Sequence, residues 1–223
     1  STDSVERFMS ATDSLMALCR KTGDEVTFYK AWSNQASYNF TKVNREKGLA
    51  IAKEERAYAE KHDSKFGLYA ATNSYATMMS GIGMIDEAEK AFLQAIDYQR
   101  RFIPEENAAF QYIGLAKIEH NRHHYDKTVD YGKKALAEKG AQPIHQLHAY
   151  NYILFGLGEL SQANPNDNAL KQTFNEAYAK RKKLIEDQGL QDATGGIVNY
   201  YEAQVNGRYK ELPELATKIV NKG

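Results

Sequence analysis

The chain has 223 residues, of which 42% are hydrophobic and 26% are charged, as is usual for a folded globular protein. Lys plus Arg number 29, and so do Asp plus Glu, so no surplus of positive charge is available to bind nucleic acid or an anionic membrane. The sequence contains no run of 18 apolar residues, which predicts that this segment has no membrane-spanning helix and no membrane contact.

The single thiol of the sequence leaves the compartment open. The single cysteine, Cys19, cannot form an internal disulfide, and one thiol is compatible with a reducing or an oxidising compartment. The chain begins at Ser1 without a methionine or an apolar leader, so we interpret it as a mature exported protein or as a segment of a longer one.

Apolar periodicity predicts an all-α chain, folded as one domain over residues 1–223. A first helix within residues 1–22 precedes five helical hairpins, which we place at 24–62, 66–102, 105–138, 143–187 and 192–221. Asp24 and Asn44 are suited to cap helices through their side chains, whereas Gly140 and Gly189 are suited to end them.

A short pattern recurs at helix starts about every 40 residues, beginning at Ile85, at Tyr125 and, two periods later, at Tyr209. Each copy has an apolar or aromatic residue, two polar residues and then a small or apolar one. A single hairpin cannot bury its apolar face alone, so a repeat of this period indicates stacked helical hairpins.

The second hairpin resembles a tetratricopeptide repeat (TPR), with Gly83 in the turn followed by Ile85, Ala88, Phe92 and Ala95 at the family's offsets. The stretch Tyr125–Leu136 and the pair Leu157–Gly158 are similar to other parts of the TPR pattern. The resemblance implies a right-handed α-α superhelix, a TPR-like solenoid in which small residues allow close helix approach.

This chain departs from the TPR pattern in three ways. Thr128 stands where the pattern has alanine, and Gly132 stands where it has an aromatic residue. The unit is also about 40 residues long rather than about 34.

The segment Tyr58–Ala70 resembles the joints of TPR-like arrays that precede the membrane span in bacterial sensor histidine kinases and hybrid two-component regulators, particularly of the Bacteroidetes. The resemblance implies a non-enzymatic sensor region that binds a protein, peptide or ligand and signals through curvature or contact in a homodimer. It also implies a periplasmic or extracytoplasmic location, with the cytoplasm as the alternative. The competing hypothesis is a free-standing TPR scaffold that joins proteins without signalling.

No motif in the chain indicates catalysis, a cofactor or a metal. His120, His123 and His124 have spacings that could bind zinc or copper, but they cross an expected turn, where histidines are usually solvated, so we predict no metal site. Cys19 lacks a catalytic setting and is expected to fill space in a helix. Carboxylate pairs such as Glu54–Glu55 are expected on solvated faces.

The predicted binding surface is the inner face, which the first helix of each hairpin forms in TPR proteins. Tyrosine rings supply contact area at a low entropic cost, and side-chain amides can bond to an extended peptide backbone. The candidate binding residues are Tyr75, Tyr112, Tyr152, Asn34, Asn73 and Asn151.

Overall fold

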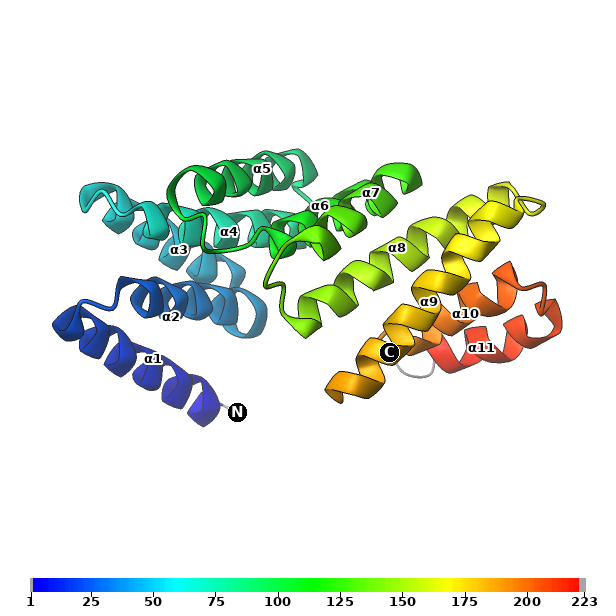
Figure 1. Ribbon diagram of the computed structural model, residues 1–223. Coiled ribbons are helices and arrows are strands. Elements are labelled where there is room, and N and C mark those ends of the chain that lie inside the picture. The colour runs from blue at the N-terminus through cyan, green and yellow to red at the C-terminus, as the bar shows by residue number, and fades with distance from the viewer. Residues whose placement is uncertain (1, 221–223) are drawn as a thin grey trace. The chain divides into compact units, whose positions relative to one another are not determined.

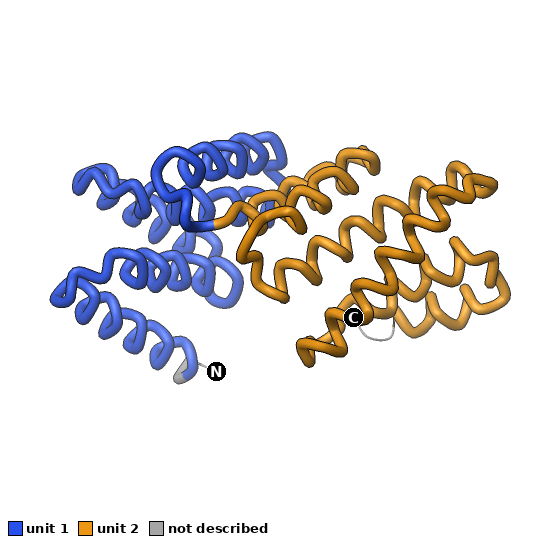
Figure 2. Tube along the Cα trace, viewed as in Figure 1, with its two compact units in different colours: residues 1–106 blue, residues 107–223 orange. Residues whose placement is uncertain are grey.

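The computed structural model describes residues 2–220, and every regular element within that range is helical. The prediction of an all-α chain is therefore confirmed. The chain separates into two compact units, residues 1–106 and residues 107–223, where the sequence had predicted one domain (Figure 2). The division falls in the non-helical segment after Phe102, which contains Pro104.

Unit 1 contains five α-helices (Figure 1). They are α1 (Thr2–Thr22), α2 (Glu25–Tyr38), α3 (Arg45–Lys61), α4 (Lys65–Gly81) and α5 (Ile85–Phe102), with a π-helical turn, Asn39–Val43, between α2 and α3. Helix α2 contacts α1, α3 and α4, and α4 also packs on α3 and α5. The first helices of the two hairpins, α2 and α4, are thus in direct contact.

The two expected caps in unit 1 are present. Asp24 accepts a hydrogen bond from the backbone N–H of Thr27 at 3.0 Å, and Asn44 accepts one from that of Lys47 at 3.0 Å. Each satisfies a donor that the first turn of a helix leaves unpaired.

The apolar stripe of α5 lies in the core as the repeat pattern predicts. Ala88 and Ala95 are fully buried, and Phe92 is 2% exposed. The two alanines permit the close approach of α4, the helix with which α5 makes its contacts in unit 1.

Glu55 corrects the expectation that Glu54 and Glu55 share a solvated face. Glu54 is exposed, but Glu55 is fully buried on α3, where its Oε1 accepts a hydrogen bond of 2.7 Å from the Ser33 hydroxyl of α2. Its other oxygen, Oε2, has no hydrogen-bond partner. Burial raises the pKa of Glu55 to about 8, against the smaller opposing effect of Ser33, so the folded protein holds a neutral acid there at pH 7.

Unit 2 contains six α-helices among its described residues (Figure 1). They are α6 (Ala109–Asn121), α7 (Tyr125–Ala137), α8 (Pro143–Ala163), α9 (Asn168–Gln188), α10 (Gly195–Val205) and α11 (Leu212–Val220), with a 3-10 turn, Tyr209–Glu211, before α11. Helix α8 contacts α6, α7, α9 and α10. As in unit 1, the first helices of successive hairpins touch one another.

Helices α6 and α10 both begin later than predicted because side chains hold the preceding loops. Before α6, the carbonyl of Glu106 accepts a hydrogen bond from the Gln99 side chain, and the backbone N–H of Ala108 donates to Glu138. Before α10, the carboxylate of Asp192 forms an ion pair with Arg181 of α9.

Glycines let the helices of unit 2 approach closely. A Cβ at Gly132 of α7 would lie 2.6 Å from Cγ1 of Ile153, and one at Gly156 of α8 would lie 2.8 Å from Cγ2 of Val129. Both distances are shorter than real Cβ contacts, so α7 and α8 fit together because these side chains are absent. The packing of α7 on α8 therefore requires a glycine at position 132.

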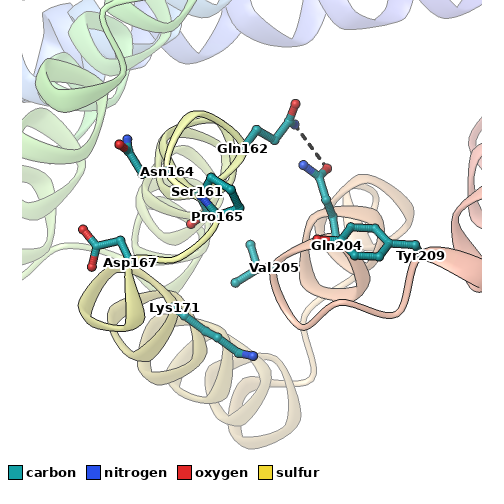
Figure 3. Close-up of a pocket in the computed structure, with 9 residues that line it drawn as sticks. All are labelled: Ser161, Gln162, Asn164, Pro165, Asp167, Lys171, Gln204, Val205 and Tyr209. Atoms are coloured by element: carbon teal, nitrogen blue, oxygen red, sulfur yellow. Dashed lines mark hydrogen bonds between the residues drawn. The ribbon is translucent and has the colours of Figure 1, made fainter.

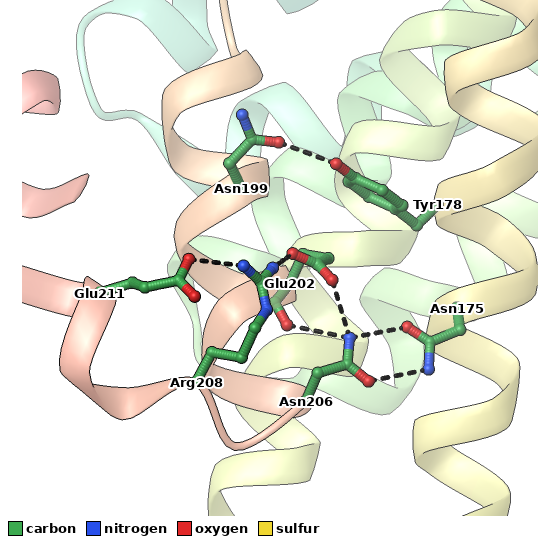
Figure 4. A network of polar contacts seen from close by, with 7 residues as sticks. All are labelled: Asn175, Tyr178, Asn199, Glu202, Asn206, Arg208 and Glu211. Atoms are coloured by element: carbon green, nitrogen blue, oxygen red, sulfur yellow. Dashed lines mark hydrogen bonds and ion pairs between the residues drawn. The ribbon is translucent and has the colours of Figure 1, made fainter.

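A polar network joins α9 to the last hairpin (Figure 4). Asn175 and Asn206 exchange two side-chain hydrogen bonds of 2.9 and 3.1 Å, and Asn206 also donates to Glu202. Arg208 pairs with Glu202 and with Glu211, which ties the turn after α10 to the start of the closing segment.

One type of turn recurs in both units. Among residues 2–220, six helices are followed by a residue with positive φ that makes this turn: Gly23, Asp63, Gly83, His123, Gly189 and Gly207. In each turn the next backbone N–H donates to the carbonyl five residues before it, at 2.8 to 3.1 Å. This is the Schellman ending, and glycine is the residue that adopts it without strain. The turns at Gly83 and His123 precede Ile85 and Tyr125. The same backbone turn therefore precedes these two copies of the sequence repeat.

Candidate functional site

The six predicted binding residues fall in both units. Asn34 on α2 is exposed, and Asn73 and Tyr75 on α4 are partly exposed. In unit 2, Tyr112 on α6 and Asn151 on α8 are buried, whereas Tyr152 on α8 is partly exposed.

Tyr112 and Asn151 have interior roles. The ring of Tyr112 stacks on that of Tyr131 of α7, with centroids 6.2 Å apart, and only 7% of the residue is exposed. Asn151 is 3% exposed, and its Oδ1 accepts a hydrogen bond of 2.7 Å from Nε of Arg181. These two side chains hold helices together and are not presented to a partner.

Arg181 explains why an asparagine is needed at position 151. This arginine of α9 is 3% exposed, and it pairs with Asp192 and donates to the hydroxyl of Thr194 at 3.0 Å. A buried guanidinium requires partners for its donors. Asn151 supplies one of them from α8.

Tyr152 belongs to a cluster of rings that was not predicted from the sequence. The ring of His120, at the end of α6, lies 6.3 Å from that of Tyr152 and 5.8 Å from that of Phe155. Phe155 lies 5.8 Å from Tyr152 and 6.0 Å from Tyr201 of α10. We call His120, Tyr152, Phe155 and Tyr201, with Tyr125 and Glu159, the ring cluster. It joins the three first helices of unit 2, and all its members are partly exposed.

Glu159 is the acidic member of the ring cluster. Its Oε1 accepts a hydrogen bond of 2.5 Å from the hydroxyl of Tyr201, and burial together with the charge of Glu159 raises the pKa of Tyr125. Burial and the neighbouring carboxylate raise the pKa of Tyr201, so its proton stays on the phenol. A Cβ at Gly158 would lie 2.7 Å from Cγ of Tyr201, so the glycine creates the space in which this ring lies.

His120 enters the ring cluster as a neutral ring. Burial lowers its pKa, and the opposing effect of Glu159 is smaller. Its Nδ1 is buried and has no hydrogen-bond partner. From the sequence, His120 was considered only as a metal ligand, and Glu159 was not predicted to belong to a site. The spacing of Phe155 and Glu159, four residues apart on one helix, was the available signal.

The other two histidines of the turn have separate partners. Nδ1 of His123 lies 2.8 Å from the Tyr125 hydroxyl, and Nδ1 of His124 lies 2.8 Å from Oε2 of the buried Glu119. Burial alone would raise the pKa of Glu119, but hydrogen bonds from His124 and Arg122 outweigh it and hold that pKa below its usual value. Within residues 2–220, no group of three His, Cys, Asp or Glu side chains is arranged to hold a metal ion.

Cys19 is a buried free thiol in the core of unit 1, as expected of a residue that fills space. It borders a hollow of about 240 Å³ between α1, α2 and α3. The guanidinium of Arg20 lies beside this hollow, 5.0 Å from the ring centroid of Phe28 and 5.6 Å from that of Tyr58. The chain's own arginine is therefore held by two aromatic faces.

A second hollow, of about 280 Å³, lies where α8, α9 and α10 meet (Figure 3). Its lining is largely polar and consists of Ser161, Gln162, Asn164, Pro165, Asp167, Lys171, Gln204, Val205 and Tyr209. Gln162 donates to Gln204 across it at 3.1 Å. The lining includes no imidazole or thiol, so this hollow offers no histidine base and no cysteine nucleophile.

The chain was compared with protein-family models, curated proteins and solved structures. No family model, no curated protein and no solved structure matches this chain. None of the helices in residues 2–220 is both long and apolar enough to cross a membrane.

Proposed function

We propose that this chain is a non-enzymatic, TPR-like binding protein that recognises a protein or peptide on the first helices of its hairpins. The observation that carries the proposal is the ring cluster, in which α6, α8 and α10 bring partly exposed aromatic rings and one carboxylate together. Aromatic residues of this kind concentrate the binding energy of interfaces.

The proposed architecture is a right-handed α-α superhelix. Two features support it: first helices contact one another in succession within each unit, and the same Schellman turn recurs along the chain. Repeats that each bury a face against their neighbours produce such arrays.

Peptide selection tests the binding function. A random peptide library is selected against the full chain, and enriched peptides are measured by fluorescence anisotropy. We expect Tyr152→Ala to weaken binding by about 1 to 3 kcal/mol, roughly 5- to 150-fold. Tyr209→Ala is the matched control, because this ring of unit 2 is 60% exposed and lies outside the ring cluster. Selection of no peptide, or equal losses in both variants, would reject the proposal.

We further propose that the chain is the sensor region of a bacterial two-component protein, located outside the cytoplasm, with binding relayed by curvature or by contact in a homodimer. The support is the resemblance of Tyr58–Ala70 to the joints of such arrays. The full reading frame tests it: about 20 apolar residues followed by a kinase core would agree with the proposal. A frame that encodes neither would favour the free-standing scaffold.

A further inference from the structure

The carboxylate of Glu159 has no cationic partner. No Lys or Arg among residues 2–220 forms an ion pair with it, and its hydrogen-bond donor is the neutral hydroxyl of Tyr201. Burial lowers the pKa of His120, which favours the neutral ring over an imidazolium beside Glu159. The ring cluster therefore holds a carboxylate that no ion pair within residues 2–220 neutralises.

Glu159 retains capacity to bind a ligand. A carboxylate has about four acceptor positions, and the Tyr201 hydroxyl occupies one of them. Partial burial strengthens any further interaction with a positive charge, because the effective dielectric constant there is lower than in water. The adjoining faces of Phe155, Tyr152 and Tyr201 would also attract a cation.

In unit 1 a guanidinium of the chain lies against two aromatic rings. Arg20 lies over Phe28 and Tyr58 at 5.0 and 5.6 Å. The ring cluster offers similar ring chemistry together with a carboxylate, but no Lys or Arg side chain in the described part of the chain pairs with that carboxylate.

We propose that Glu159 and the rings beside it bind the guanidinium of an arginine in a partner peptide, an inference that rests on the proposed binding function. A guanidinium is flat, so it stacks on aromatic faces while its N–H groups donate to a carboxylate. Lysine has a compact, strongly hydrated charge and gains less from such stacking. The ligand class is therefore an arginine-containing peptide.

The first test uses N-acetyl-arginine amide and its neutral counterpart, N-acetyl-citrulline amide, titrated into the full chain and followed by NMR of the aromatic side chains. The arginine compound should shift the resonances of Tyr152, Phe155 and Tyr201 and bind at least tenfold more tightly than citrulline. Glu159→Gln keeps an acceptor for Tyr201 and should abolish that preference. Glu186→Gln, an exposed change on α9, is the control and should leave the preference intact. Equal shifts from arginine and citrulline would refute the inference.

The second test separates this inference from the function on which it rests. Peptides selected against the chain should be enriched in arginine, and replacing that arginine with citrulline should weaken binding at least tenfold. Selected peptides that depend on Tyr152 but not on arginine or Glu159 would reject the arginine site alone. If no peptide is selected, the proposed function fails, and the NMR titration still decides whether Glu159 binds a guanidinium. Should Glu159→Gln fail to fold, Phe155→Leu, which removes one ring face, takes its place and should reduce the arginine preference.

Discussion

Replacing Glu55 with glutamine should stabilise the protein, and the gain should grow with pH. The unfolded chain releases the proton of this carboxyl near its ordinary pKa of 4.5, whereas the folded protein holds it until about pH 8. Between these values the folded state binds more protons than the unfolded state, so wild-type stability falls as pH rises. Glutamine is close in shape to the neutral acid and does not titrate.

The magnitude follows from the two pKa values. Each pH unit within the window is worth about 1.4 kcal/mol. From pH 5 to pH 8 the stability of Glu55→Gln relative to wild type should therefore rise by about 3 to 4 kcal/mol. Below pH 4.5 the carboxyl is neutral in both states, and any remaining difference reflects the amide itself.

Urea unfolding followed by tryptophan fluorescence measures this difference in the free energy of unfolding, with a probe in unit 1. Trp32 is the only tryptophan and lies on α2 next to Ser33, the residue that donates to Glu55. Glu54→Gln is the matched control, since Glu54 is the exposed neighbour on the same helix. All three proteins contain the same histidines, so the difference between Glu55→Gln and wild type isolates Glu55. A difference that does not change between pH 5 and pH 8 would show that Glu55 is ionised or solvated in the folded protein.

Three further substitutions test the packing. Asp63→Gly should stabilise the protein by about 0.5 to 1 kcal/mol, because Asp63 has a φ of 51° and its ion pair is exposed; an unchanged or lower melting temperature would contradict this. Asp192→Ala should lower the free energy of unfolding in chemical denaturation by about 3 to 5 kcal/mol, because it leaves Arg181 buried without its anion. Adding Arg181→Met should restore most of the loss. No recovery would show that the pair matters for another reason. Phe92→Ala should lower the free energy of unfolding by about 3 to 5 kcal/mol, because Phe92 is buried. An unchanged denaturation midpoint would show that another face of α5 packs on the core.

The sequence was sufficient for elements that local chemistry determines. Asp24 and Asn44 cap helices, and Gly83 supplies the left-handed turn before α5, because each effect depends on residues within one turn of the chain. The buried stripe of α5 was predictable because its helical periodicity is clear.

Features that depend on partners distant in sequence were not predictable. Glu55 is buried because Ser33 meets it from another helix, and nothing adjacent to Glu55 in the sequence indicates that contact. Asn151 was predicted to face a ligand, but Arg181, thirty positions later, binds it instead. The candidate site divides in the same way. Tyr152 could be proposed from its position on its own helix, whereas Glu159 gains its role from Tyr201 on α10, which the sequence pattern does not reveal.

The contacts of Arg181 have a consequence for dividing the chain. The arginine lies on α9, but Asp192 and Thr194, which bind it, belong to the loop that leads into α10. A fragment that ends at the helix-terminating Gly189 would keep the buried guanidinium and lose two of its three partners. The apparent boundary between the fourth and fifth hairpins is therefore a poor place to truncate the protein. Deletion of the last hairpin should destabilise α8 and α9 rather than leave a shorter, intact array.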